Sequence, residues 1–306
     1  IREKYSEVMV NLDLEWERET TTLINSRGLY CQQTDISNSV SLGVEWFRDE
    51  DFFGIYDGEY SHENLDLSRV INSILQRLKW AKKNSKIKSG NTPVLFTPNS
   101  SVILWETVTE ALNGKRILDK SSPWSECQNQ RVVSPCLTLT QQPDFKPYDC
   151  PFDDEGTVTQ TLTLISEGKL NSFYGDKKTA HQLGIPEKGN GFRASLGSYP
   201  TPDLVNLVIS KGNKSFKELI DSLDYGIIVD QILGDGGDIS GDFSFNVDLG
   251  YLVKKGEVVG RVKDVMLAGN IYQALDNLKY LGCDRTWSGS CYTPSVVIEQ
   301  LSLVSE

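Results

Sequence analysis

The segment from Asn99 to Gly114 most constrains how this chain can fold, because its residues predict one helix with both ends marked. Asn99 or Ser100 can accept hydrogen bonds from the free N–H groups of a first helical turn. Gly114 suits the left-handed residue that ends a helix. At about 100° per residue, the apolar side chains of the segment share one face, which we expect to be buried. They are Leu104, Val108, Ala111 and Leu112.

Two glutamates of the same segment lie four residues apart on roughly the opposite face. They are Glu106 and Glu110, and Trp105 stands at the border between the two faces. Like charges at this spacing repel each other slightly in water and more strongly when buried. A solvated face is the commoner explanation for such a pair, because Glu is usually exposed. The alternative is a working site or the relic of one.

The net charge argues against a nucleic-acid-binding protein. The 306 residues carry a formal charge of −11, whereas phosphate contacts require clustered Lys and Arg. No run of 18 apolar residues and no signal-peptide pattern is present, so we expect a cytoplasmic protein that makes no membrane contact. Because Ile1 is not a start methionine, we expect residues upstream of it.

The cysteines and histidines do not form a recognisable catalytic or metal-binding pattern. The six cysteines have irregular spacing without a CxxC pair, which favours reduced thiols. Among them, Cys291 lies in a segment of small residues and is a weak candidate for a reactive thiol or a metal ligand. The two histidines are interpreted as structural, with His62 exposed before a helix and His181 at a helix end. With two histidines, the chain cannot form an all-histidine zinc site.

The fold class predicted from the pattern is α+β, with a mixed α/β first part and a hairpin-dominated, β-rich second part. Residues 7–18 alternate between apolar and polar, which predicts a half-buried strand with Val8, Leu12 and Trp16 on its inner side. Asp66 is expected to cap a helix that runs to about Lys83. We expect the division between two domains, 1–145 and 146–306, in a segment rich in Pro, Gly and Asp. Near the end, Asn270 is expected to cap a helix that continues to Gly282.

Two further segments could bind a ligand. In the glycine-rich segment 234–242, Gly236, Gly237 and Asp238 are candidates for close approach to a peptide backbone, with a wide hairpin loop as the equally weighted alternative. This segment lacks the GK[ST] of a phosphate-binding loop. The acidic run 153–156 lacks the ligand spacing of a calcium loop, so an exposed turn is favoured there over a cation site.

Taken together, several of these segments resemble the TldD/PmbA family, whose PmbA side is also called TldE. The longest is SGDFSFNVDLGYLVKKGEVVGRVKDVMLAGN, at 240–270. Others follow in the order expected for the family. They are Cys150 to Gly156, Gly191 to Ser195, Thr201-Pro202 leading to Asn206-Leu207-Val208, and Thr293-Pro294-Ser295, with the turn Leu23 to Gly28 in the first half. The resemblance covers nearly the whole chain, with a shortened N-terminal segment.

The resemblance implies a cytoplasmic α+β protein that pairs into a dimer around an internal cavity. The TldD-type subunit of the family is a zinc metallopeptidase acting on unfolded peptides, and it carries HExxxH on a helix and a cysteine ligand near its C-terminus. The PmbA-type subunit lacks that motif. The older family label, modulator of DNA gyrase, does not imply DNA binding.

Carried over by position, the family's zinc motif falls on the segment from Asn99 to Gly114. Its first histidine corresponds to Trp105 and its second to Glu110, while Glu106 keeps the general-base position. Tryptophan does not bind zinc, and the GKxGQ run that accompanies the family's cysteine is absent after Cys291. The motif is therefore degenerate, so we predict no catalytic residue, no cofactor and no metal in this chain, and zinc only in a TldD-type partner.

The leading hypothesis is a non-catalytic, PmbA/TldE-like subunit that pairs with a TldD-type subunit and helps hold an unfolded peptide by strand addition to an exposed sheet edge. Two alternatives remain open. One is a metallopeptidase in its own right, with an atypical metal site formed by Glu106, Glu110 and Cys291. The other is a homodimeric peptide-binding protein without catalysis.

Overall fold

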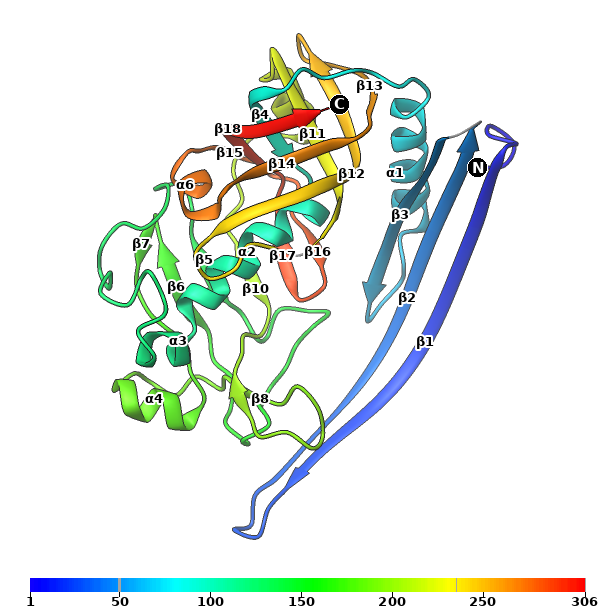
Figure 1. Cartoon of the computed structure of the whole chain (residues 1–306). Helices are drawn as coiled ribbons and strands as arrows, with labels where there is room; N and C mark the ends of the chain where they lie inside the picture. The colour runs from blue at the N-terminus through cyan, green and yellow to red at the C-terminus, as the bar shows by residue number, and fades with distance from the viewer. Residues whose placement is uncertain (49–50, 235, 306) are drawn as a thin grey trace.

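A computed structural model describes residues 1–48, 51–234 and 236–305. Figure 1 shows a long arm of β-strands beside a body of sheets and helices, with the tip of the arm extending past the body. The mixed α+β class is confirmed, and strands dominate the second half. No helix of the described parts is long and apolar enough to cross a membrane.

The arm is an antiparallel sheet of three strands. These are β1 (Val8–Ile24), β2 (Tyr30–Arg48) and β3 (Asp51–Ser61), with β1 at the free edge. Val8, at the base of the arm, is buried as expected, but Leu12 and Trp16 are exposed, so the half-buried prediction was wrong for most of β1. The alternation indicated the strand correctly; what it could not show is that the described residues do not cover this side of the arm.

Helix α1 (Leu67–Trp80) lies between the arm and the body (Figure 1). The Asp66 side chain caps it by accepting from the backbone N–H of Arg69, as predicted. Val70, Ile74 and Leu78 are its buried stripe, and they pack in one cluster with residues of the arm and of the body sheet. This apolar stripe therefore holds the base of the arm against the body.

Five strands of the larger sheet pair in a closed ring, because β11 pairs with β12 as well as with β4. Successive residues of a ring strand point into different hydrophobic clusters. In β4, Val94 and Phe96 pack in one cluster and Leu95 packs in the other. Such strands are buried on both faces and therefore have continuous apolar runs. The ring consists of β4 (Gly90–Phe96), β11 (Tyr225–Leu233), β12 (Asp242–Lys254), β14 (Val265–Asn270) and β18 (Val296–Ser305), with β13 (Glu257–Val262) and β15 (Leu278–Leu281) alongside.

A second sheet of six short strands forms the rest of the body. In both sheets, strands that precede position 145 pair with strands that follow it. The expected division into two domains at that position stays a prediction. The strands, in spatial order, are β16 (Thr286–Ser288), β17 (Cys291–Thr293), β10 (Leu207–Ile209), β5 (Leu139–Gln141), β6 (Leu162–Ser166) and β7 (Lys169–Leu170), and a separate pair is formed by β8 (Gly191–Phe192) and β9 (Thr201–Pro202).

Helix α2 (Pro98–Leu112) is the predicted central helix, but its caps differ from those expected. Its N-cap is Thr97, which makes no side-chain capping bond. Its C-terminal residue is followed by Asn113, which caps the next helix, α3 (Gly114–Leu118). Gly114 is not left-handed; a Cβ atom there would lie 2.7 Å from the Tyr174 carbonyl oxygen, so glycine is required for close packing.

Three shorter helices complete the body. They are α4 (Lys177–Leu183), α5 (Phe216–Asp221), which begins with a capping box formed by Ser215 and Glu218, and α6 (Ile271–Asp276). The helix expected from Asn270 to Gly282 was wrong in its second half, where Leu278–Leu281 is strand β15. Pairing with β18 satisfies the backbone of these residues, so tertiary contacts override a helical apolar pattern.

Candidate functional site

Helix α2 positions Trp105 in the core beside strand β17. The indole is 1% exposed, and its Nε1–H donates to Thr293 Oγ1 at 2.8 Å. Thr293 Oγ1 also lies 3.0 Å from Ser101 Oγ, so both hydroxyls and the indole form one buried polar group. The first position of the degenerate motif is thus occupied by a packed side chain whose only polar atom is satisfied.

The two glutamates of α2 lie on its outer face, as predicted. Glu106 is exposed, and the backbone of Gly236 lies so close to it that a Cβ atom there would be 2.9 Å from Glu106 Oε2. The Glu110 side chain is 47% exposed and pairs with Arg116 at 2.9 Å. Glu110 therefore behaves as a surface ion-pair residue.

Strand β17 carries Cys291 to the side of α2, so the structure places the cysteine beside the helix that holds the degenerate motif. Cys291 is buried, and all six cysteines are free thiols. Burial, and secondarily the charge of Glu106, raises the pKa of Cys291 far above its usual value. A thiol with a raised pKa is a poor nucleophile and a poor metal ligand, because both roles require the thiolate.

The glycine-rich segment lies over the outer face of α2. Thr107 Oγ1 donates to the Gly237 carbonyl oxygen at 3.0 Å, and Gly236 lies against Glu106. Asp238 is exposed, and hydrogen bonds from Ser240 lower its pKa. Asp235, in the same segment, lies outside the described residues. The loop backbone therefore lies directly against α2 at Gly236 and Gly237, and peptide binding there stays a prediction.

The outer face of α2 carries negative charge, which raises the pKa values of neighbouring groups. Burial, followed by the charges of Asp238 and Glu110, raises the pKa of Tyr272 to about 12. Burial and then the charge of Glu110 also raise the pKa of Asp203. A surface of this kind attracts cationic groups such as a peptide amino terminus or a lysine side chain.

The comparisons with known proteins decide the family. The family model described as the PmbA/TldA metallopeptidase C-terminal domain matches residues 89–305. The chain belongs to the TldD/PmbA metallopeptidase family. The matched region contains α2 and Cys291 but excludes the arm. The expected resemblance is thereby confirmed, as is the family's link to metallopeptidases.

Individual relatives agree with this TldD/PmbA assignment. A metalloprotease TldD homolog from Haemophilus influenzae is 31% identical over 78% of this chain and 48% of its own length. The structure of TldE from Thermococcus kodakarensis is 24% identical with a TM-score of 0.90, over 99% of this chain and 71% of that one, which shows a shared fold. A Thermotoga maritima structure whose name refers to modulation of DNA gyrase is 26% identical with a TM-score of 0.87, over 98% of this chain and 71% of that one. The chain thus spans about half the length of the Haemophilus relative.

The histidines of this TldD/PmbA chain have different surroundings. His181 is exposed in the last turn of α4, as predicted. His62 was expected to be exposed, but its side chain is 15% exposed and lies between Asp35 and Asp149. Within the described ranges, these three residues form the one group of at least three His, Cys, Asp or Glu side chains whose ligand atoms lie within 4.8 Å of one another. Glu106, Glu110 and Cys291 form no such group.

The acidic run at 153–156 is not simply an exposed turn, because Asp153 is buried. Its Oδ1 accepts from the backbone N–H groups of Glu155 and Thr157, and its Oδ2 accepts from that of Gly191. The carboxylate is therefore used in holding the turn against β8.

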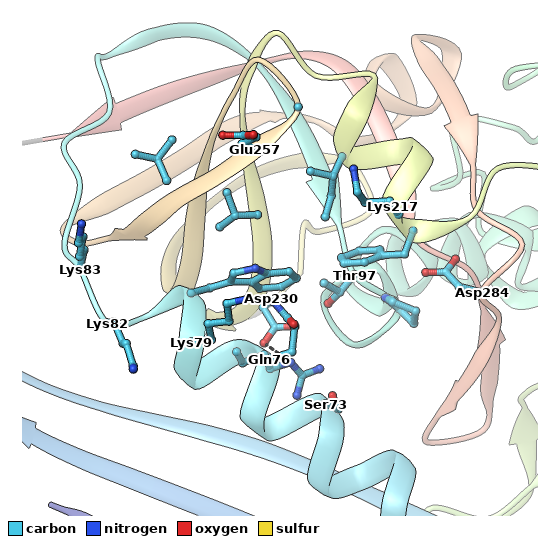
Figure 2. Close-up of a pocket in the computed structure, with 18 of the residues that line it drawn as sticks. Ser73, Gln76, Lys79, Lys82, Lys83, Thr97, Lys217, Asp230, Glu257 and Asp284 are labelled. Carbon is cyan, nitrogen blue, oxygen red and sulfur yellow. Dashed lines mark ion pairs between the residues drawn. The ribbon is translucent and has the colours of Figure 1, made fainter. Parts of the chain in front are cut away.

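A cavity of about 1050 Å³ lies between α1, α5 and the start of α2, and Figure 2 draws residues that line it. At its base, Arg77 Nε lies 3.1 Å from Asp230 Oδ2; burial raises the pKa of Asp230, and the Arg77 charge opposes that rise. Trp80 and Phe216 are among the apolar lining residues, and four lysines also line the cavity. Such a cavity can take a ligand with an apolar body and an anionic end. The lysines are Lys79, Lys82, Lys83 and Lys217.

Proposed function

We propose that this chain is a non-catalytic, PmbA/TldE-like subunit of a TldD/TldE-type metallopeptidase that processes unfolded peptides in the cytoplasm. The observation that carries the proposal is the packing of Trp105. The residue at the position of the family's first zinc-binding histidine is buried and hydrogen-bonded to Thr293, so a metal there would require the core to be rebuilt. Zinc and the general base would come from a TldD-type partner.

The exposed side of the arm supports the need for a partner. β1 is a free sheet edge of 17 residues that carries Leu12, Leu14 and Trp16 in exposed positions. Long apolar edges of this kind are usually covered, because they otherwise pair with other chains. We propose that the TldD-type subunit covers β1 and that the complex is a dimer.

The peptide would lie near Gly236, Gly237 and Asp238, beside the outer face of α2. The close approach of the backbone at Gly236 and the negative charges of Glu106 and Glu110 support this placement. An extended peptide supplies backbone N–H groups and a cationic amino terminus, which both suit such a surface.

Co-purification from the native host tests the proposal. The full natural chain, carrying an affinity tag, should bring down a near-equimolar partner that contains HExxxH, and the pair should cleave an unfolded peptide. Trp16→Asp should reduce recovery of the partner more than tenfold, whereas Tyr199→Asp, which changes an exposed aromatic residue that is not part of the arm, should not. A homodimer that binds peptide without cleaving it would contradict the proposal, as would peptide cleavage by this chain alone.

A further inference from the structure

Three potential metal ligands meet at the junction of the arm with the body, although they are far apart in the sequence. Asp35 belongs to β2, His62 follows β3, and Asp149 lies in the segment between β5 and β6. His62 Nε2 is 2.8 Å from Asp35 Oδ1, and His62 Nδ1 is 3.7 Å from Asp149 Oδ1. The imidazole is thus bracketed by two carboxylates.

The atoms that face one another here are not satisfied by hydrogen bonds. His62 Nε2 and Asp149 Oδ1 are both cut off from solvent, and neither has a hydrogen-bond partner of acceptable geometry in the described structure. Nε2 and Asp35 Oδ1 are nevertheless only 2.8 Å apart. Buried polar atoms without partners are costly, so this arrangement calls for another group to satisfy them.

Charge gives an independent argument. His62 is the ion-pair partner of both carboxylates, and among the described residues no Lys or Arg pairs with either of them. By contrast, Asp51 at the base of the arm pairs with Arg48, Arg261 and Lys263. Two carboxylates outnumber the single basic group between them, which leaves an excess of negative charge that a cation would neutralise.

We propose that Asp35, His62 and Asp149 bind a divalent first-row transition-metal ion. One imidazole nitrogen with two carboxylate oxygens is a ligand set for Zn²⁺ or Mn²⁺, whereas Mg²⁺ and Ca²⁺ prefer oxygen ligands alone. Ligand atoms of one ion approach each other to about 3 Å at bond lengths near 2.0–2.2 Å, which fits the closest pair here. The site is distinct from the α2 position and uses Asp35 and His62, which lie outside the matched family domain.

Neighbouring side chains orient the proposed ligands. Tyr60 Oη donates to Asp35 Oδ2 at 3.1 Å, and Gln33 Nε2 donates to the Asp149 carbonyl oxygen at 3.1 Å. The Tyr60 ring stacks on that of Tyr148, with centroids 4.8 Å apart. Hydrogen bonds from outside the ligand set hold metal ligands in position and strengthen binding.

A bound ion would fasten the arm to the body. Asp35 and His62 come from the arm sheet and its exit, while Asp149 comes from the body, so one ion bridges both. Binding would therefore order the junction and protect it from proteolysis. The role is structural, and it does not depend on the proposed subunit function.

Isothermal titration of the chelator-treated full chain with Zn²⁺, Mn²⁺ and Mg²⁺ tests the site. We expect one equivalent of Zn²⁺ or Mn²⁺, with at least 100-fold weaker binding in His62→Ala and Asp35→Asn. His181→Ala removes the other histidine of the chain and should bind as the wild type does. Limited proteolysis should show the arm protected by the ion in the wild type and in His181→Ala only.

A gentler variant keeps the test valid if the ligand variants fold poorly. Tyr60→Phe retains the stacked ring but removes the donor to Asp35, so binding should weaken by about 10–100-fold while circular dichroism stays unchanged. Failure of the wild type to bind Zn²⁺ or Mn²⁺, or equal binding by His62→Ala and the wild type, would overturn the proposal.

Discussion

Two places in this molecule bear on metal binding, and they differ in how far the sequence alone describes them. On α2 the family's motif position is present in the sequence, but Trp105 is packed in the core and Cys291 is buried with a raised pKa. At the arm junction no motif exists, yet His62 lies between Asp35 and Asp149. A metal site requires side chains that lie close together in space. Sequence spacing predicts such proximity only for residues of the same helix or strand.

The largest expected effect on stability is that of replacing the buried Trp105 on α2. Trp105→Ala should lower the free energy of unfolding by about 3–5 kcal/mol, because a fully buried indole is lost and a cavity remains. Urea denaturation of the purified chain measures it. Trp16→Ala is the matched control, since Trp16 is 67% exposed, and it should cost less than about 0.5 kcal/mol. Equal losses in the two variants would mean that Trp105 is not a core residue.

Thr293→Val isolates the polar contact of Trp105 from its packing. The variant keeps the shape of the side chain but leaves the indole N–H without its acceptor, which should cost about 1–3 kcal/mol. The same denaturation experiment applies, and Trp fluorescence should shift with the change around the indole. A variant as stable as the wild type would show that the hydrogen bond does not help to fix Trp105.

Asp51 is a carboxylate whose pKa is lowered by the protein's own cationic side chains, so it should make stability depend on pH. Burial alone would raise the pKa of Asp51, but hydrogen bonds from Asn84, Lys263 and Arg261 and the Arg261 charge lower it to about 2. Because this pKa lies below the unfolded value, the stabilisation is present above pH 4 and is lost as the pH falls toward 2.

Between pH 4 and pH 2, the free energy of unfolding should fall by about 2 kcal/mol through the protonation of Asp51. Denaturation measured over a series of pH values tests this. Asp51→Asn should be less stable at neutral pH and should lack this part of the acid dependence. A wild type and an Asp51→Asn variant with parallel pH profiles would contradict the assigned pairing.

The smallest expected effect is that of Glu110→Gln. The side chain makes an exposed ion pair with Arg116, so its loss should change the unfolding free energy by less than about 0.5 kcal/mol. It should also leave metal content unchanged. A larger loss that depends on added Zn²⁺ would point to a metal on α2 and would favour a metallopeptidase in its own right.

Local signals predicted much of the secondary structure. The Asp66 cap was predictable because its side chain bonds within the first turn, a contact encoded over four residues. Residues 278–281 were misassigned because their strand pairs with β18, and that pairing is not local. Likewise, alternation along β1 indicates a strand but cannot tell which side lies against another surface.

In the candidate site, too, contacts within one helix were predictable and contacts between separate elements were not. The positions of Trp105, Glu106 and Glu110 follow from one helix, and their placement on its faces was largely predictable from its period. The contact of Cys291 with that helix was expected only through the family resemblance. The approach of Asp35, His62 and Asp149 depends on three separate elements, so no spacing rule could have revealed it.

Metal analysis of the purified full chain tests the contrast between the two places most directly. Elemental mass spectrometry should be performed on the wild type, on His62→Ala, and on a triple variant with Glu106→Gln, Glu110→Gln and Cys291→Ser. The account predicts one divalent ion in the wild type and in the triple variant, and none in His62→Ala. An ion that is retained by His62→Ala but lost from the triple variant would contradict it, and so would a wild type that binds no ion after loading with Zn²⁺ or Mn²⁺.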